Sequence, residues 1–306
     1  MKKTLKNILK FAMIPALVYT LGSCEKQKTL KINNSTYDIH AQEIIQTKSS
    51  FLEDDTIKIG VVSDIEGAIQ NAQVSAKKLQ KEKVDVLIIS GDCYENESIR
   101  RNPLYPNSTN NLEEMIAGIK PYAEIGALVL IIPGNHEKKD IYKKAINKLK
   151  EDYPNVFDIK NKSVDLKDFN IVGMGGYHDS RFMDSEGFLL EKGDYEKALN
   201  SLQKFQNQNE PTIFVTHSPP KSNSKIDYVH GAGNVGDSEI EKIMNNKSLD
   251  KIVNVHGHIH EGGRNVAKYK SGVALNVASI TSYMNQKGVN TPLLIIKDND
   301  IQYKEL

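Results

Sequence analysis

The chain has 306 residues, 39% of them hydrophobic, which is enough to bury a substantial core without disulfides or other staples. Its 40 basic and 39 acidic residues leave a net charge of +1, and this balance argues against a nucleic-acid-binding domain. Apart from the N-terminal residues, no run is long and apolar enough to span a bilayer.

The first 24 residues have the pattern of a bacterial lipoprotein signal peptide. Four lysines within the first ten residues precede a mainly apolar run, which is too short to cross a bilayer comfortably. The run ends in Leu21-Gly22-Ser23-Cys24, which resembles a lipobox. We therefore expect residues 1–23 to be removed and Cys24 to carry lipid, so that the protein is exported and anchored on the periplasmic or cell-surface side of a membrane. A plain cleaved signal and an uncleaved anchor are the alternatives.

Residues 24–55 are polar and rich in Lys, Asn, Ser and Thr. We expect a flexible tether there, although residues 30–32 and 37–39 could add an edge strand. One domain over residues 56–306 is the simplest division of the rest, because no repeat or Pro-rich or Gly/Ser-rich linker interrupts it.

Short apolar runs alternate with amphipathic helical patterns through the first part of this domain. We predict strands over residues 57–62, 84–89 and 127–132, each followed by a helix. A further helix is predicted around residues 195–205, among strands near 156–157, 164–166, 171–172, 213–215 and 252–255. The last part is strand-rich, with runs at 272–276, 293–296 and 301–303. This alternation predicts an α/β fold, with a second sheet packed on the first.

Polar residues with metal-binding side chains stand where five of these strands end. In chain order they are Asp64, Glu66, Asp92, Asn135, His136, His217, His258 and His260. Ligands of open α/β sheets bind at the carboxyl ends of the strands, so we expect these side chains to meet at one edge. Helix capping could explain Asp64 or Asn135 alone, but not ligand-type residues at all five ends. Carboxylates and imidazoles in this number suit two metals that share a bridging ligand.

The spacing D-x-E, G-D, G-N-H-E, H and G-H-x-H in this order resembles the calcineurin-like metallophosphoesterase superfamily over roughly residues 56–280. The resemblance implies a four-layer αββα sandwich with two divalent metal ions. It implies that one metal is held by Asp64, Glu66 and His260, the other by Asn135, His217 and His258, with Asp92 bridging. It makes His136 the catalytic acid.

Two positions depart from the family pattern. The first motif usually ends in His, and Glu66 stands there instead. Its carboxylate would make the first site oxygen-rich, which favours Mn²⁺, with Fe²⁺, Zn²⁺ or Mg²⁺ as other possibilities; alternatively, Glu66 only caps the helix beginning near Gly67. The phosphatase branch reads G-D-x-x-D-R, whereas here Glu95 and Asn96 replace the last two residues. Either Glu95 or Glu137 could orient the His136 imidazole.

The function implied by the resemblance is hydrolysis of a small phosphomonoester or phosphodiester by a bridging hydroxide, with His136 protonating the leaving group. The alternative is an exported, non-catalytic binding protein on the same fold, with a metal site weakened at Glu66. The sequence does not indicate an oligomeric state.

A few other residues could contribute to the pocket, but loop or surface roles are simpler for each of them. They are Tyr177, His178, His230, Arg100, Arg101 and Arg181. Cys93 follows the predicted bridging Asp92, and on a strand it would point away from that side chain. We expect it to be a buried structural thiol.

Overall fold

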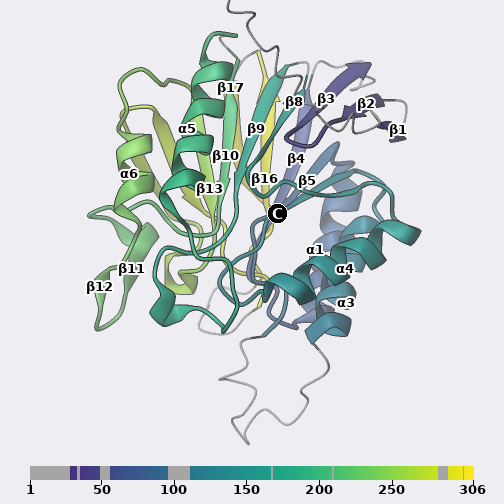
Figure 1. The fold of residues 1–306 in the computed structure, drawn as a ribbon, viewed down its shortest axis with the longest axis horizontal. Coiled ribbons are helices and arrows are strands. Elements are labelled where there is room, and N and C mark those ends of the chain that lie inside the picture. Colours follow the sequence, from purple (N-terminus) through teal and green to yellow (C-terminus); the bar gives the residue numbers. More distant parts are fainter. Residues whose placement is uncertain are drawn as a thin grey trace, which may run out of the picture.

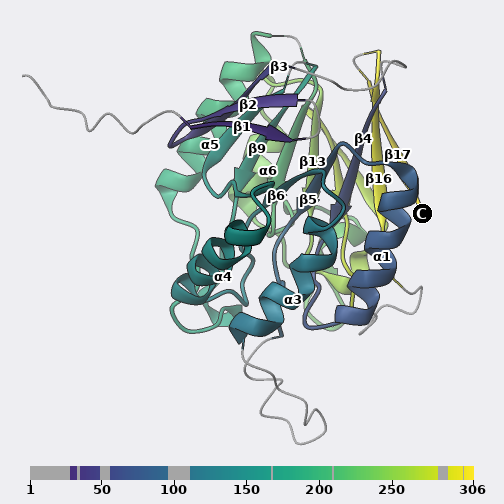
Figure 2. The same cartoon turned by 90° about the vertical axis from the view of Figure 1, so that its right-hand side faces the viewer.

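Two β-sheets packed face to face form the centre of the molecule, and helices cover both outer faces (Figures 1 and 2). This computed structural model describes residues 28–32, 35–48, 56–95, 111–166, 168–208, 210–281, 289–298 and 300–306. The core between the sheets contains Ile59, Val86 and Leu130 from one sheet and Ile171 and Ile213 from the other, all fully buried. Sheet-on-sheet burial of β-branched and leucine side chains is what joins the two halves of the fold.

The smaller sheet has six strands in the order β17-β16-β4-β5-β6-β7. Its parallel strands are β4 (Ile57–Val62), β5 (Val86–Ile89), β6 (Leu128–Ile131) and β7 (Val156–Asp158). β16 (Pro292–Lys297) and β17 (Asp300–Glu305) add to the β4 edge in antiparallel pairing. Every residue of β5 and β6 is buried, as expected for parallel strands covered on both faces.

The larger sheet has nine strands in the order β1-β2-β3-β8-β9-β10-β13-β15-β14. Four neighbouring strands are parallel: β9 (Phe169–Met174), β10 (Thr212–Thr216), β13 (Ile252–His256) and β15 (Gly272–Asn276). Antiparallel β8 (Lys162–Leu166) and β14 (Val266–Tyr269) flank them. A separate hairpin joins β11 (Tyr228–Val229) and β12 (Gly233–Asn234).

The remaining strands of this sheet are β1 (Lys28–Ile32), β2 (Ser35–Ile39) and β3 (Glu43–Lys48). They form its outer edge, with β3 paired in parallel to β8. The expectation of a flexible tether therefore does not hold for residues 28–32 and 35–48, which reach further into the fold than a single edge strand would. The reason is that Ile32, Tyr37 and Ile44 are buried against the core between the sheets.

The helices form two separate layers. On the outer face of the six-stranded sheet lie α1 (Ile69–Glu82), α3 (Asn111–Ala123) and α4 (Lys139–Asp152), which share a second core with that sheet. On the outer face of the nine-stranded sheet lie α5 (Lys192–Gln206) and α6 (Ser238–Met244), over a third core. This arrangement confirms the predicted four-layer αββα sandwich. None of the described helices combines the length and the apolar composition needed to cross a membrane.

Candidate metal centre

The eight polar residues predicted from the sequence lie in loops that follow five strands of the two sheets. The loops after β4, β5 and β6 come from the six-stranded sheet, and those after β10 and β13 come from the nine-stranded sheet. Their side chains gather in three overlapping groups of possible metal ligands, whose donor atoms lie within 4.8 Å of one another in each group. Asn135 contacts two of the imidazoles in these groups. The two sheets therefore present their polar ends to the same place.

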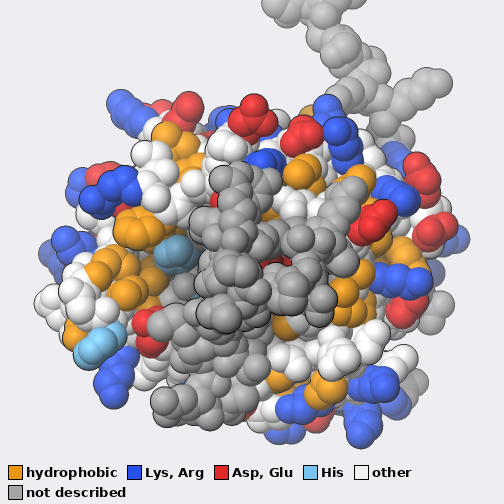
Figure 3. Space-filling model, turned by 90° about the horizontal axis from the view of Figure 1, so that it is seen from below, with side chains coloured by type: hydrophobic (Ala, Val, Ile, Leu, Met, Phe, Trp, Pro, Cys, Tyr) orange, Lys and Arg blue, Asp and Glu red, His pale blue; other side chains and the backbone are white. Residues whose placement is uncertain are grey.

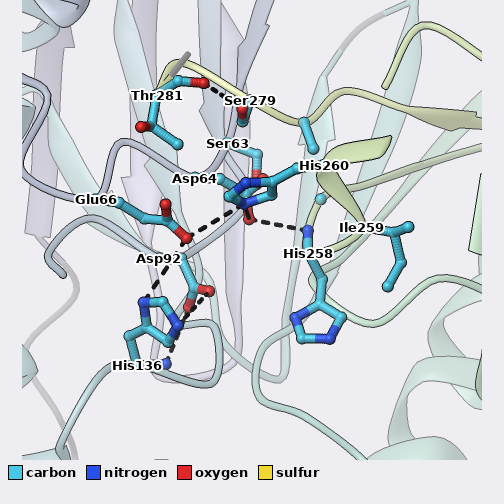
Figure 4. Close-up of polar contacts among 12 residues, drawn as sticks. Ser63, Asp64, Glu66, Asp92, His136, His258, Ile259, His260, Ser279 and Thr281 are labelled. Atoms are coloured by element: carbon cyan, nitrogen blue, oxygen red, sulfur yellow. Dashed lines mark hydrogen bonds and ion pairs between the residues drawn. The ribbon is translucent and has the colours of Figure 1, made fainter. Parts of the chain in front are cut away.

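The first group is Asp64, Glu66 and His260. Figure 4 shows the imidazole of His260 between the two carboxylates, with Nε2 at 3.5 Å from Asp64 Oδ1 and 3.2 Å from Glu66 Oε1. Burial lowers the pKa of His260, but the charges of Glu66 and Asp64 raise it well above the ordinary value. Helix α1 begins at Ile69 without a side-chain cap, so Glu66 is turned into the cluster and does not cap that helix.

The second group is Asp92, His217 and His258, with Asn135 beside it. His217 Nε2 lies 3.1 Å from Asp92 Oδ2 and 2.8 Å from Asn135 Oδ1, and His258 Nδ1 also lies 2.8 Å from that amide oxygen. The other ring nitrogen of His217 faces the Ser90 carbonyl oxygen at 2.8 Å. That contact places an N–H at Nδ1 and leaves Nε2 as the nitrogen available to a metal.

Asp92 belongs to two groups, because it also lies beside Glu66 and His136. Its Oδ2 is 3.5 Å from His136 Nε2, and its Oδ1 accepts a hydrogen bond of 3.0 Å from the His136 backbone N–H. Burial raises the pKa of Asp92, but the charges of His136 and His217 together lower it by more, so the net shift is strongly downward. An ionised carboxylate therefore stands where the group of His217 and His258 meets the group of Glu66 and His136.

The residues present fit a divalent cation. Asp64, Glu66 and Asp92 place three carboxylates together with side-chain exposures of 0%, 7% and 2%. Buried anions are costly unless cations compensate them. Asp64 Oδ2 is buried and has no hydrogen-bond partner among the described residues. This oxygen is therefore available to bind a cation. Oxygen and imidazole donors in this mixture match the preferences of Mn²⁺, Fe²⁺ and Zn²⁺.

The backbone is strained at the same residues. Asp64, Glu66, Asp92 and His258 all have positive φ, at 54°, 43°, 53° and 69°. Non-glycine residues adopt this region rarely, and such residues cluster at functional sites. Gly257 allows a similarly close approach of the loops, since a Cβ there would collide with the side chains of Ser63 and Asp64. The loops are folded to bring ligand atoms close together, which local helix capping would not require.

One of the two sequence hypotheses was that Glu137 orients the His136 imidazole. The structure shows a different role for Glu137. Its Oε2 accepts hydrogen bonds from the backbone N–H groups of Asp92 at 3.1 Å and Gly134 at 2.6 Å, and its Oε1 accepts one from Cys93 at 2.6 Å. The carboxylate therefore fixes the two loops that follow β5 and β6. His136 Nδ1 instead faces the Tyr94 carbonyl oxygen at 3.2 Å. Burial lowers the pKa of His136, but the charges of Asp92, Glu66, Glu137 and Glu95, in that order, raise it to about 9.

The other residues singled out in the sequence have varied positions. Cys93 is fully buried, as predicted, and burial raises the pKa of its thiol. Tyr177 packs its ring on His258, with centroids 4.1 Å apart, and His178 contacts Ser218 Oγ at 3.2 Å. His230 is exposed on the turn between β11 and β12. Arg100 and Arg101 lie outside the described residues.

The sequence reasoning missed the backbone carbonyls of Ser90 and Tyr94, which set the orientation of His217 and His136. A main-chain carbonyl is present at every residue and leaves no signal in the residue types. Only the packing of the loops can show which carbonyl meets which imidazole.

Comparisons with known proteins agree with this geometry. The sequence profile of the calcineurin-like phosphoesterases matches residues 57–262, well over half of the chain. Among solved structures, a dimetal phosphatase from Danio rerio is similar, with a TM-score of 0.59 at 10% identity, covering 82% of this chain and 96% of that one. A protein from Thermus thermophilus is also similar, with a TM-score of 0.55 at 11% identity, covering 82% and 99%. At these identities the structures support the fold alone.

A search of curated protein sequences gave no significant match. The profile match stands on its own length and on the ordered motifs within it, and the fold agrees with it. The chain belongs to the calcineurin-like phosphoesterase family, a metal-dependent family, and it is a phosphoester hydrolase.

Proposed function

We propose that the protein hydrolyses small phosphomonoesters or phosphodiesters with the help of two divalent cations. In this proposal one cation is held by Asp64, Glu66 and His260, the second by Asn135, His217 and His258, and Asp92 contacts both. The observation that carries it is the overlap of the three candidate ligand groups. Glu66 links the group of Asp64 and His260 to Asp92, and Asp92 belongs in turn to the group of His217 and His258. Two unconnected metal sites would not need shared carboxylates.

When bound, two such cations would neutralise charge on the phosphoryl group and lower the pKa of water so that hydroxide is available at neutral pH. The chain itself supplies the proton for the leaving group. His136 is held by its backbone N–H and by Nδ1, which faces the Tyr94 carbonyl oxygen. Its Nε2 then carries the second ring proton toward the centre, where a leaving alkoxide can take it. His136 is buried, with only 8% of its surface exposed, which keeps its orientation fixed.

The metal in this proposal is Mn²⁺, and the support for it is the position of Glu66. With Asp64 and Asp92, Glu66 gives the first site three carboxylates for one imidazole, and oxygen-rich sites suit Mn²⁺ better than imidazole-rich ones. The alternative of a non-catalytic binding protein depended on a site weakened at Glu66. That alternative loses its basis, because the Glu66 carboxylate lies within the cluster at 3.2 Å from His260.

The test is an assay on protein lacking residues 1–24. We expect p-nitrophenyl phosphate or bis(p-nitrophenyl) phosphate to be hydrolysed only after addition of a divalent metal, with about two metal ions bound per chain by elemental analysis. Chelation should remove activity, and returning Mn²⁺ should restore it. One bound metal per chain at full activity would contradict the dinuclear part of the proposal, and turnover that resists exhaustive chelation would contradict its metal dependence.

We further propose that the protein is exported and held on a membrane by lipid on Cys24. The support is the sequence alone, since residues 1–27 lie outside the described residues. Replacing Cys24 by Ser should release the protein into the soluble fraction, because two or three acyl chains would no longer hold it. A Ser23→Ala variant provides the control and should remain with the membrane. Retention of the Cys24→Ser protein after a high-salt wash would contradict lipid anchoring.

A further inference from the structure

The segment from Tyr177 to Asp184 lies against the metal centre and is fixed to it at several points. The ring of Tyr177 packs on His258 with centroids 4.1 Å apart. Further along, Asn135 Nδ2 donates a 2.8 Å hydrogen bond to the Phe182 carbonyl oxygen, and the Asp184 N–H donates one of 3.1 Å to the Asn135 carbonyl oxygen. The same Asn135 side chain contacts His217 and His258 through its Oδ1. A single amide group therefore separates the Phe182 backbone from two candidate metal ligands.

This segment presents an aromatic ring and a guanidinium to solvent beside the centre. Phe182 is 54% exposed, and the side chain of Arg181 is 80% exposed. The Arg181 guanidinium lies over the Phe182 ring, 5.6 Å from its centroid. Figure 3 shows the molecule from below, and hydrophobic side chains lie beside histidine side chains on one part of that face.

The pair is held in place before any ligand arrives. Asp179 accepts hydrogen bonds from Arg181 Nε at 2.9 and 3.0 Å and from Nη2 at 2.5 Å, so the guanidinium plane is fixed. Among the described residues, the Arg181 guanidinium uses Nε and Nη2 for its hydrogen bonds, which leaves Nη1 to donate to a ligand. A side chain that is already ordered loses less entropy when it binds a ligand.

The fold does not account for this arrangement. Phe182 belongs to none of the hydrophobic clusters among the described residues, and an exposed ion pair such as Asp179–Arg181 contributes little to stability. A single exposed apolar residue is common on protein surfaces and usually has no function. Here the exposed ring lies beside an ordered guanidinium, and the Phe182 backbone is tied through Asn135 to the centre where the phosphoryl group would bind.

We propose that Phe182 and Arg181 form a subsite for a planar ring in the organic group of the phosphoester. The ring stacks on Phe182, and Arg181 Nη1 donates to an acceptor on the ring or its substituents. The substrates are then aryl or nucleoside phosphoesters, in preference to sugar or alkyl phosphoesters. This inference rests on the proposed function, because it assigns the organic group of a substrate whose phosphoryl group binds at the metal centre.

The test compares two phosphomonoesters of the same kind of primary alcohol, adenosine 5′-monophosphate and ribose 5-phosphate, which differ only in the base. Their leaving groups are alike, so a difference between them reports binding of the ring. We expect the Mn²⁺-loaded enzyme to prefer the adenosine ester in kcat/KM. Phe182→Ala should reduce kcat/KM for that ester about tenfold, mainly through KM, and leave ribose 5-phosphate within about twofold. Phe182→Trp should retain the preference, since it retains a ring face.

Truncation of Phe182 leaves its carbonyl in place, so the contact with Asn135 is kept in the variant. Tyr303→Ala is the matched control, because Tyr303 is an exposed aromatic residue (39%) on β17, and it should change neither substrate. Equal losses for both substrates in Phe182→Ala, or no preference in the unmodified enzyme, would overturn the proposal.

A binding measurement separates this inference from the proposed function. Calorimetric titration of the Mn²⁺-loaded protein with each of the two esters reports ring binding even where turnover is absent. Tighter binding of the adenosine ester that is lost in Phe182→Ala supports the subsite, whatever the outcome of the hydrolysis assay. Equal affinities for the two esters would overturn it, even for an active phosphoesterase.

Discussion

The two sheets make different contributions to the candidate metal centre. The loops of the six-stranded sheet supply oxygen donors, from Asp64, Glu66, Asp92 and Asn135. The loops of the nine-stranded sheet supply imidazoles, from His217, His258 and His260. Each candidate ligand group that contains His217, His258 or His260 combines donors from both sheets. The comparison teaches that these ligand sets are made by packing one sheet on the other, since neither sheet alone provides them.

The two sides also differ in their backbone. We call the loops of the six-stranded sheet the oxygen side and those of the nine-stranded sheet the imidazole side. On the oxygen side, Asp64, Glu66 and Asp92 all have positive φ, whereas on the imidazole side only the ligand candidate His258 does. Side-chain length does not account for this difference, because Glu66 shares the positive φ of the shorter aspartates. Strained residues of this kind persist only where the surrounding structure holds them.

The largest effect should come from removing the Asp92 carboxylate, which contacts both cations in the proposal. Asp92→Ala deprives both sites of a ligand and leaves His217 without its carboxylate partner. We expect metal content to fall and turnover to drop about 10⁴-fold, since neutralisation of phosphoryl charge by metal contributes several kcal/mol. Elemental analysis and steady-state kinetics measure the two effects. The control is Asp140→Ala, an exposed carboxylate paired with Lys144, which should change neither. Unchanged metal content in Asp92→Ala would show that Asp92 does not bridge.

His136 is the one imidazole on the oxygen side, and it sharpens the comparison because we assign it no metal. His136→Ala should leave metal content intact and reduce turnover about 10²- to 10⁴-fold, as expected for loss of a general acid. The loss should be smaller for p-nitrophenyl esters, whose leaving group needs no proton. His230→Ala, on the exposed turn between β11 and β12, is the control. His136 also lies within ligand distance of Glu66 and Asp92, so loss of metal in this variant would make it a ligand instead.

Glu137 tests whether the oxygen side depends on its fixed backbone. Burial and the charge of Asp92 raise the pKa of Glu137 to about 7, while the N–H groups of Cys93 and Gly134 lower it. Glu137→Gln would place an amide NH₂ against at least one of the three backbone N–H groups from which the carboxylate now accepts hydrogen bonds. We expect a loss of about 1–3 kcal/mol of stability and a 10- to 100-fold weaker metal affinity. Thermal unfolding and metal titration measure these. The same change at the exposed Glu196 should have no effect, and normal metal affinity in Glu137→Gln would mean that the carboxylate does not support the ligands.

The smallest effect should come from converting an oxygen donor into a nitrogen donor. Glu66→His changes the ratio of donors in the first site without removing a ligand, so activity should persist while metal preference moves from Mn²⁺ toward Zn²⁺ or Fe²⁺. We expect less than about a tenfold change in the activity ratio between metals, measured by reconstituting the metal-free protein with each one. Glu66→Gln should instead weaken binding at the first site. If Glu66→Gln left both stoichiometry and preference unaltered, Glu66 would not be a ligand despite its position.

Much of the fold could be predicted because the apolar pattern is strong where strands are buried on both faces. The predicted strands over 57–62, 84–89 and 127–132 correspond to β4, β5 and β6, whose residues are nearly all buried. The three outermost strands of the nine-stranded sheet, β1, β2 and β3, were harder to recognise, because only one face of each is covered and polar residues occupy the other. The pairing of β3 with β8 joins residues more than a hundred positions apart, which a local pattern does not reveal.

The sequence by itself determined which residues form the candidate centre, because ligand-type side chains follow five strands in an order that chance does not explain. Only the tertiary structure decided how they are arranged. It turns Glu66 into the cluster and away from the α1 terminus, uses Glu137 to hold two loops, and aligns His217 through the Ser90 carbonyl. The physical reason is that donor chemistry belongs to the side chain and can be read from residue type. Orientation comes from φ, from close backbone approach and from hydrogen bonds to the main chain, and these exist only once the two sheets have packed together.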